Sequence, residues 1–374
     1  MPLHIAIDVR RLGFFGIGTY IRNLVSALAR LDRENRYSLI TLPGAEGLSA
    51  LGPNFRVAPY EGASSGLAHD VSFPVFARHL KADLFHIPLN VVPYFMPRPY
   101  VVTVHDLSSI IFQSSGGLRG AVHRERYRRG AARAARIIAV SNATRRDLED
   151  VLGIPENRIQ SIYSAPDPAF TEHTRPAAEQ EQILQRYQIR PPFILYAGTI
   201  RPHKNIGRLV EAFAVLRAEL ENHPVYRDLR LVIIGDELSK YPEVRRTVIA
   251  TRMEPFVRFL GFVPMETLKV FYRTATVFAV PSLAEGFGLA PLEAMACGTP
   301  VVASDLPALV EAVGDAAELV SPDNVFDVAR GIRTLLLDPE SRAHRVRSGL
   351  AQAGRFHWDH TARAVLDVYL GIKV

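Results

Sequence analysis

The sequence predicts an α/β protein built from two doubly wound, Rossmann-like domains whose parallel sheets face a central cleft. Three observations support this fold class. The chain has 374 residues, which is more than one ordinary α/β core accommodates. Apolar, β-branched runs of strand length alternate with helical patterns, as they do where helical crossovers join parallel strands. The alternation stops between residues 165 and 192, where Pro, Gln, Glu and Thr predominate, and then restarts.

The interruption divides the chain into two domains. We expect the linker near residues 167–173, an N-terminal domain at residues 1–170 and a C-terminal domain at residues 171–355. Strands are predicted at residues 3–9, 37–42, 55–58, 82–86, 100–105, 136–140 and 158–163 of the first domain, and at residues 193–197, 229–234, 256–260, 275–280, 300–303 and 317–320 of the second.

Composition is that of an ordinary globular protein, with 48% hydrophobic and 22% charged residues. The lone Cys297 cannot form an intramolecular disulfide, and we expect it to be a small buried side chain. The first residues enter a strand directly, without the basic segment and apolar core of a signal peptide. No apolar run approaches the ~18 residues that span a bilayer. These features favour a cytoplasmic protein.

The stretch from Pro281 to Pro300 carries the strongest functional signal. It places Glu285 and Glu293 on either side of a glycine turn and a helix start, directly after a predicted strand. Ligands bind at the carboxyl edge of a parallel sheet because loop amides and helix N-termini gather there. Carboxylates offer paired acceptors to sugar or ribose hydroxyls. The alternative is structural: Glu285 would cap the helix and Glu293 would be a solvated acid in its first turn.

The Glu, seven residues, Glu spacing with Gly-Phe-Gly inside it resembles the retaining glycosyltransferases of family 4, which have the two-domain GT-B fold. The resemblance implies that Glu285 and the amides after it hold the donor sugar, and that Glu293 holds the ribose of the nucleotide. It also implies that a C-terminal helix over residues 356–374 packs back on the first domain, with Trp358 as a core anchor. The donor-binding residues implied here are Gly286, Phe287, Gly288, Leu289 and Glu293.

A glycine-rich turn follows the first predicted strand. Its spacing, G-x-x-G-x-G, is the reverse of the dinucleotide fingerprint, and the second strand does not end in an acid, so a nicotinamide-dependent dehydrogenase is not expected. Gly16 and Gly18 resemble the donor-binding loop of family members. A plain tight turn explains them equally well.

His105 closes the strand at residues 100–105, and Asp106 follows it at a polar edge. It resembles the family's histidine at this place, which implies a hydrogen bond to a hydroxyl of the donor sugar and a catalytic role. The alternative is a histidine of the core.

Cations follow the first strand of the second domain. Arg201 and Lys204 precede a helix predicted at residues 206–216, where fixed charges and the helix N-terminus would neutralise a leaving diphosphate. Many family members carry the arginine two positions earlier, which leaves Lys204 as the firmer assignment. By position, the resemblance also assigns Gly198, Gly235 and Val263 to the nucleotide pocket.

The sequence therefore predicts a retaining glycosyltransferase that moves a hexose from a nucleotide diphosphate sugar to a glycan or lipid-linked acceptor. No D-x-D triplet occurs, so we expect neither a metal nor any other cofactor. The phrases around His105 and Lys204 look like those of bacterial mannosyl- and rhamnosyltransferases of surface polysaccharides, which favours GDP-mannose over a UDP-hexose. The rivals are a sugar nucleotide epimerase or a phosphorylase on the same fold, and a scaffold without turnover.

Excess positive charge is concentrated in one stretch. The net charge is +6, and many arginines lie between residues 118 and 146. We expect Arg124, Arg126, Arg128 and Arg129 either to bind an anionic membrane surface or phosphorylated acceptor, at the inner face of the plasma membrane, or to form a solvated helix face. Nucleic acid is not an expected partner, because no aromatic stacking pattern accompanies the charge.

Overall fold

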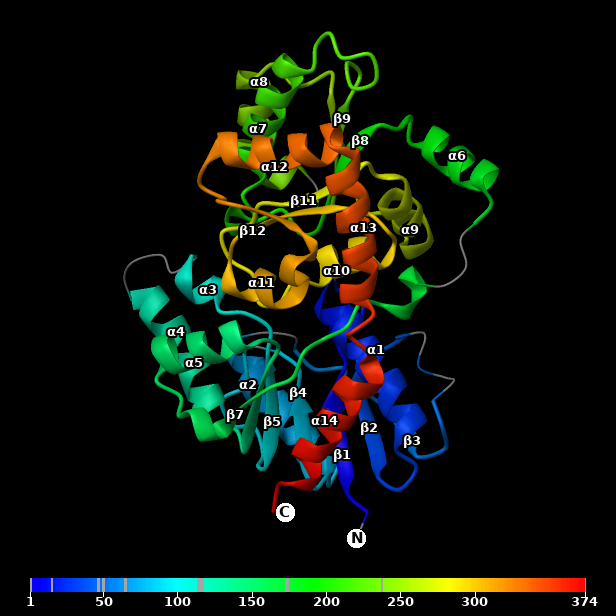
Figure 1. Ribbon diagram of the computed structural model, residues 1–374. Coiled ribbons are helices and arrows are strands. Elements are labelled where there is room, and N and C mark those ends of the chain that lie inside the picture. Colours follow the sequence, from blue (N-terminus) through cyan, green and yellow to red (C-terminus); the bar gives the residue numbers. More distant parts are fainter. Residues whose placement is uncertain are drawn as a thin grey trace. The chain divides into compact units, whose positions relative to one another are not determined.

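The computed structural model describes residues 2–14, 16–45, 48, 51–63, 66–89, 91–112, 118–171, 175–236 and 238–373. The chain forms two compact units, Met1–Ser164 with His357–Val374, and Ala165–Phe356 (Figure 1). The second unit begins a few residues before the boundary placed from the sequence. Phe170, within that difference, is fully buried, so this part of the connecting segment packs as core. Residues 172 and 173 of the expected linker lie outside the described residues.

Within the described residues, the first unit holds a seven-stranded parallel sheet in the order β3-β2-β1-β4-β5-β6-β7. The chain runs outward from β1 to β3 and then returns to the other side of β1. Its strands are β1 His4–Asp8, β2 Arg36–Thr41, β3 Phe55–Pro59, β4 Leu84–Ile87, β5 Tyr100–Val104, β6 Arg136–Ala139 and β7 Ile159–Ser161. Its helices are α1 Ile17–Leu31, α2 Gly66–His79, α3 Ser108–Ile111, α4 Leu118–Arg133, α5 Asn142–Leu152 and α14 Trp358–Leu370.

The second unit repeats this plan with a six-stranded parallel sheet, counted over the described part of the chain, in the order β10-β9-β8-β11-β12-β13. Its strands are β8 Phe193–Ala197, β9 Arg230–Ile234, β10 Val257–Gly261, β11 Val277–Val280, β12 Val301–Ser304 and β13 Glu318–Val320. Its helices are α6 Ala177–Arg186, α7 Ile206–Glu219, α8 Pro242–Ala250, α9 Met265–Thr274, α10 Leu289–Ala296, α11 Pro307–Val313, α12 Val325–Leu337 and α13 Pro339–Ala353.

The predicted strands are confirmed, with ends that shift by one or two residues. They were recognisable because central strands such as β5 and β8 are buried at every position, which requires an unbroken apolar run. Helix α1 begins at Ile17, directly after Gly16, which adopts a positive φ of 65° as the N-cap. The helix buries Leu24 and Leu28, and each such burial contributes about 1.5–3 kcal/mol.

The tail belongs to the first unit, where α14 lies beside α1 (Figure 1). Trp358 is buried, and its ring meets the Tyr20 ring edge to face at 5.7 Å between centroids. Thr361 Oγ1 donates to the carbonyl of Tyr163 at 2.7 Å. The role expected of Trp358 as a core anchor is confirmed.

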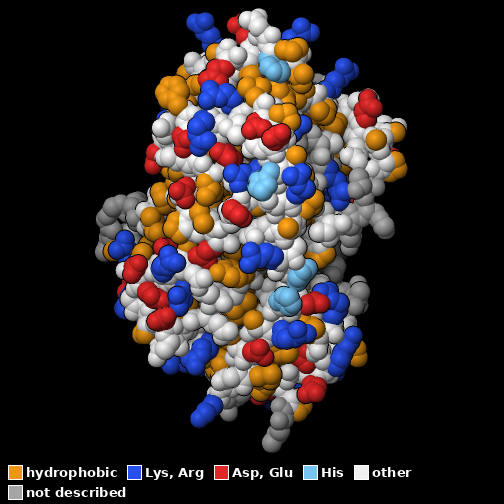
Figure 2. All heavy atoms as spheres, in the orientation of Figure 1, with side chains coloured by type: hydrophobic (Ala, Val, Ile, Leu, Met, Phe, Trp, Pro, Cys, Tyr) orange, Lys and Arg blue, Asp and Glu red, His pale blue; other side chains and the backbone are white. Residues whose placement is uncertain are grey.

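Figure 2 shows one face of the molecule, on which basic and acidic side chains are interspersed. None of the helices in the described residues combines the length and apolarity that crossing a bilayer requires.

Candidate active site

The topology of the second unit selects one place for a ligand. The chain leaves β8 toward β9 and β10 on one side, and it later passes through β11 to β12 and β13 on the other. The loops after β8 and β11 therefore diverge at the carboxyl edge between two neighbouring strands. Open α/β sheets bind ligands at such a switch point. Residues 198–205 follow β8, and residues 281–288 follow β11.

An ion pair joins these two loops. Lys204 Nζ lies 2.7 Å from Glu285 Oε1, and Ser282 Oγ donates to the same oxygen at 2.8 Å. The side chains of Lys204 and Glu285 are 17% and 16% exposed. Both charges are thus fixed in place and still accessible to a ligand. The structure brings together the two residues that the sequence assigned to the sugar and to the leaving diphosphate.

Hydrogen bonds to backbone carbonyls hold the two loops together. Asn205 adopts a left-handed conformation, with φ of 58°, and its Nδ2 donates to the carbonyls of Pro281 and Pro322 at 3.0 and 2.8 Å. The amide of Leu283 donates to the carbonyl of His203 at 2.7 Å. Sequence reasoning assigned no role to Asn205 or Ser282. Asparagine directly before a helix was the available signal, because it tolerates positive φ and carries its own donors.

Arg201 lies on the solvent side of the same turn. It precedes the short 3-10 helix Pro202–Lys204, its side chain is exposed, and it forms no ion pair with any described residue. The structure does not bring Arg201 to the Lys204–Glu285 pair, so its contact with a diphosphate stays a prediction.

Three glycines of the predicted pocket allow close backbone packing. A Cβ on Gly235 would lie 2.0 Å from the carbonyl oxygen of Gly198, so the ends of β8 and β9 meet there only without a side chain. Gly288 has a φ of 117°, and a Cβ on it would lie 2.9 Å from Leu309 Cδ2. Gly286 is buried, and Gly288 is the N-cap of α10, which begins at Leu289. The backbones of Gly286 and Gly288 therefore directly precede a helix N-terminus, where an anion can bind.

Two of the expected contact residues direct their side chains into the core. Phe287 is 4% exposed and packs edge to face on Phe356 at 5.4 Å between ring centroids. Val263 is 2% exposed, whereas its neighbour Phe262 is 69% exposed. The roles assigned to Phe287 and Val263 are therefore restricted to their backbone. Next to Gly235, Asp236 Oδ2 accepts from the amide of Ile200 at 3.3 Å, and residue 237 lies outside the described residues.

Glu293 is buried rather than solvated. It lies in α10 at 8% exposure, and the hydroxyl of Tyr272 donates to its Oε2 at 3.2 Å. Burial, and then the charge of Glu293, raise the pKa of Tyr272 well above its usual value, so the phenol keeps its proton and acts as donor. The N-cap of α10 is Gly288, not Glu285. Both structural alternatives for the carboxylates are therefore wrong.

The glycine turn of the first unit follows β1, next to the switch point between β1 and β4. A Cβ on Gly18 would lie 2.3 Å from the carbonyl oxygen of Leu12, and Gly16 needs its positive φ to begin α1. These local requirements favour the tight-turn reading. Contact of either glycine with a donor stays a prediction.

A buried ion pair stabilises the start of this turn. Arg10 contacts both carboxylate oxygens of Asp8, at 2.8 and 2.7 Å, and its guanidinium lies 3.9 Å above the centre of the Phe73 ring. Sequence reasoning missed this pair, for which an acid at the end of β1 was the only signal.

His105 follows β5 and is half-buried. Its Nε2 lies 3.2 Å from the carbonyl oxygen of Pro88, which can only accept, so Nε2 carries the proton. Burial lowers the pKa of His105 to about 4, which keeps the imidazole neutral near pH 7. The Tyr20 ring meets it edge to face at 4.9 Å. A neutral imidazole of fixed tautomer can hydrogen-bond a hydroxyl but carries no charge for a phosphate.

Behind Tyr20 lies a second histidine that sequence reasoning missed. His86 is fully buried, with Nδ1 2.5 Å from the hydroxyl of Tyr369 and Nε2 2.7 Å from Thr103 Oγ1. Thr103 Oγ1 lies 3.2 Å from the hydroxyl of Tyr20. Burial, together with repulsion from His105, lowers the pKa of His86 to about 3. This chain of neutral groups connects α14 to the residue that packs on His105.

The four arginines of α4 do not form one free face. Arg126 pairs at 2.6 Å with Asp70, whose side chain is 5% exposed, and Arg129 stacks on Tyr94 at 3.9 Å. Arg124 and Arg128 are exposed, and Arg128 pairs with Glu125 at 2.8 Å. Three of the four predicted basic side chains, Arg126, Arg128 and Arg129, are thus engaged within the unit, although Arg128 remains exposed.

This arrangement suits an anionic ligand with hydroxyl groups. Lys204 and the N-terminus of α10 supply positive potential at one sheet edge, and Glu285 and Glu293 supply acceptors there. Across the described residues, no three His, Cys, Asp or Glu side chains are grouped so that they could hold a metal ion.

Each half of the chain matches a known protein-family model. Residues 15–170 match the Glycosyltransferase Family 4 model, and residues 179–351 match Glycosyl transferases group 1. The chain is 31% identical over 295 residues to O-antigen chain mannosyltransferase B of Escherichia coli, covering 78% of this chain and 75% of that one. It is 28% identical over 311 residues to the serotype-specific mannosyltransferase WbdA of Escherichia coli, covering 82% of this chain but only 37% of that longer relative.

Among solved structures, Anabaena Alr3699/HepE in complex with UDP-glucose superposes with a TM-score of 0.77 at 19% identity, covering 99% of this chain and 100% of that one. The fold is therefore GT-B, and the protein is a glycosyltransferase. The chain belongs to the group 1, family 4 glycosyltransferases.

Proposed function

We propose that this enzyme is a metal-independent retaining glycosyltransferase that moves mannose from GDP-mannose to a glycan or lipid-linked acceptor in surface polysaccharide synthesis. The observation that carries the proposal is the Lys204–Glu285 pair at the switch point of the second sheet, fixed by Ser282. The mannosyltransferase relatives support the choice of sugar.

In the proposed donor complex, Glu293 accepts the ribose hydroxyls and Glu285 accepts a hydroxyl of the sugar. Lys204 and the amides at the start of α10 neutralise the diphosphate, and Arg201 joins them by moving toward it. The bond between the anomeric carbon and the diphosphate oxygen breaks, and the acceptor oxygen bonds to the same face. The departing phosphate receives the acceptor's proton. Neutral His105 orients the sugar through a hydroxyl.

A UDP-hexose is the alternative donor, because the HepE structure was solved with UDP-glucose. A nucleotide panel separates the two. A ligand present at 100 times its dissociation constant stabilises the fold by about 2.7 kcal/mol, which thermal unfolding detects. We expect GDP and GDP-mannose to raise the Tm more than the corresponding UDP, dTDP and ADP compounds. Stabilisation by UDP compounds alone would show that the donor is a UDP-hexose and not GDP-mannose.

We also propose that the enzyme works at the inner face of the plasma membrane. The support is local: α4 exposes Arg124 and Arg128, and Val122 on the same helix is 59% exposed. Basic and apolar side chains on one helix suit an anionic lipid surface.

A further inference from the structure

The carboxylate assigned to the ribose has a partner that the sequence did not reveal. The Tyr272 hydroxyl donates to Glu293 Oε2 at 3.2 Å, and the tyrosine side chain is itself almost fully buried. A free Glu side chain populates several rotamers, which place its carboxylate differently. A buried donor at one oxygen selects among these rotamers before the nucleotide arrives, which reduces the ordering cost of binding.

Tyr272 is itself held from two sides. Thr299 Oγ1 donates to its carbonyl oxygen, and the Phe170 ring meets its ring edge to face at 5.2 Å and 90°. Phe170 comes from the segment that opens the second unit. These contacts restrict the movement of the Tyr272 backbone and ring.

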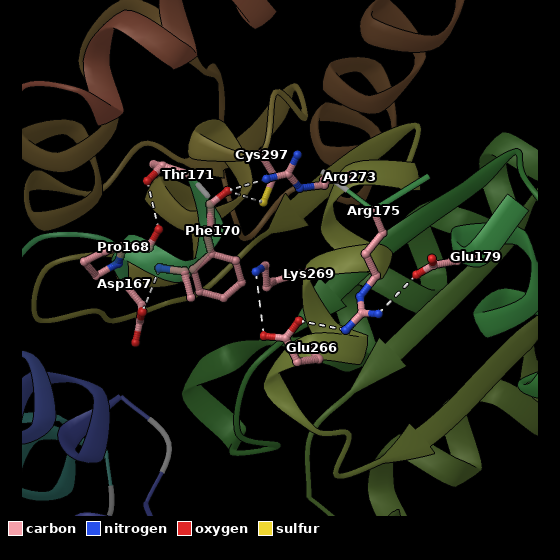
Figure 3. A network of polar contacts seen from close by, with 11 residues as sticks. Asp167, Pro168, Phe170, Thr171, Arg175, Glu179, Glu266, Lys269, Arg273 and Cys297 are labelled. Carbon is pink, nitrogen blue, oxygen red and sulfur yellow. Dashed lines mark hydrogen bonds and ion pairs between the residues drawn. The ribbon is translucent and has the colours of Figure 1, made fainter. Parts of the chain in front are cut away.

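Figure 3 shows how that segment is fastened. The carbonyl of Phe170 accepts from Arg273 Nη2 at 2.9 Å and lies 3.6 Å from Cys297 Sγ. Further along, Arg175 reaches Glu266 of α9 at 3.1 Å. Arg273 and Glu266 belong to the helix that carries Tyr272, and Cys297 directly follows the helix that carries Glu293. Phe170 and Arg175 are thus anchored on α9, which carries Tyr272, and Phe170 also lies beside the end of α10, which carries Glu293.

We propose that Tyr272 is a positioning residue for nucleotide recognition: its hydroxyl fixes Glu293 for the ribose diol, and Phe170 holds the Tyr272 ring in place. The inference rests on the proposed function, since it assumes that Glu293 accepts ribose hydroxyls. It goes further by naming Tyr272 as the residue that positions Glu293 for the ribose hydroxyls, and by adding Phe170 as the residue that supports Tyr272.

A thermodynamic cycle with GDP and 2′,3′-dideoxy-GDP tests the proposal by calorimetry. A hydrogen bond to a charged group is worth enough that wild type should bind GDP at least tenfold more tightly than the dideoxy compound. Tyr272→Phe keeps the ring and removes only the hydroxyl. It should weaken GDP about tenfold and leave the dideoxy compound within twofold, with KM for GDP-mannose raised and kcat within twofold. Equal losses for both nucleotides, or no loss, would overturn the role of Tyr272.

A matched control separates positioning from stability. The hydroxyl of Tyr226 is also buried in this unit and donates to the carbonyl of Leu336 at 2.8 Å. Tyr226→Phe should lower the Tm as Tyr272→Phe does but keep the wild-type ratio between the two nucleotides. A ratio that falls equally in both variants would mean general loosening and would contradict the proposal.

The same cycle distinguishes failure of the ribose assignment of Glu293 from failure of the positioning role of Tyr272. If wild type does not discriminate between the nucleotides, or if Glu293→Ala still does, then the ribose assignment fails and the inference fails with it. If Glu293→Ala abolishes discrimination and Tyr272→Phe retains it, only the positioning role fails. Phe170→Leu should reduce the ratio about threefold, and an unchanged ratio would remove Phe170 from the proposal.

Discussion

The two units fix their candidate functional groups in opposite ways. In the second unit, Lys204 and Glu285 are a charged pair, and each remains about one-sixth exposed. In the first unit, His105 and His86 are neutral, and the contacts that hold them are rings, hydroxyls and a carbonyl. Burying charge is costly, whereas a neutral imidazole can be buried once its hydrogen bonds are satisfied. The difference is what the proposed function expects of groups that bind a charged diphosphate, as Lys204 would, and of groups that bind a hydroxyl, as His105 would.

The largest expected effect is on the charged side of this comparison. Lys204→Ala removes the fixed cation beside Glu285, and we expect kcat to fall at least a hundredfold, as it does when one preorganised group is lost at a site of developing charge. Lys204→Arg should recover part of the rate. Donor-dependent release of nucleotide measures both. Near wild-type turnover in Lys204→Ala would show that the diphosphate binds elsewhere.

Glu293→Ala tests the other carboxylate of the same unit. Loss of a charge-assisted hydrogen bond costs roughly 1.5–3 kcal/mol, so nucleotide affinity should fall more than tenfold while the fold remains intact. Calorimetric titration with GDP measures the affinity, and circular dichroism reports the fold. An unchanged dissociation constant would exclude Glu293 from the site.

The two neutral histidines of the first unit predict that the stability of the fold depends on pH. The pKa values of His86 and His105 are lowered in the folded state to about 3 and about 4. Their contribution to stability is complete above the unfolded value of about 6.5 and is lost as pH falls below it, because the unfolded chain then binds more protons. Each histidine should contribute up to about 1.4 kcal/mol per pH unit between pH 6 and 4.5.

Urea unfolding at pH 7, 6, 5 and 4.5 measures this slope. His86→Gln keeps hydrogen-bonding capacity without a titrating ring, so it should flatten the slope by about half. An identical slope in wild type and His86→Gln would mean that His86 is not held neutral by the fold.

Much of the architecture was predictable from the sequence, because strands such as β8 are apolar at every position and the Glu285–Glu293 spacing marks a loop and helix at a sheet edge. Contacts between distant side chains were not. Tyr272 and Glu293 come from different helices, and His86 and Tyr369 are separated by 283 positions. No periodicity encodes such pairs, since they exist only after the strands are ordered. The burial of the Phe287 and Val263 side chains was likewise not predictable, because a motif position reveals nothing about side-chain direction.

The smallest expected effect concerns the two faces of α4. Arg124 and Arg128 are exposed, so each should contribute about 1 kcal/mol to attraction by an anionic bilayer, and this attraction should weaken with salt. The double Gln variant should sediment less with vesicles containing phosphatidylglycerol at low salt, and it should bind GDP normally. Arg126→Gln is the contrast, because it leaves Asp70 buried without its partner and should lower the Tm. Salt-insensitive sedimentation, equal in wild type and the double variant, would favour a solvated face.

The central claim is that fixed protein cations, and not a metal ion, neutralise the leaving diphosphate. Release of GDP from GDP-mannose by wild type, compared in excess EDTA and in added Mn²⁺ or Mg²⁺, tests this claim most directly. We expect equal rates in the two conditions, and in both we expect Lys204→Ala to lose the rate. Turnover that requires the added metal and stops in EDTA would contradict it.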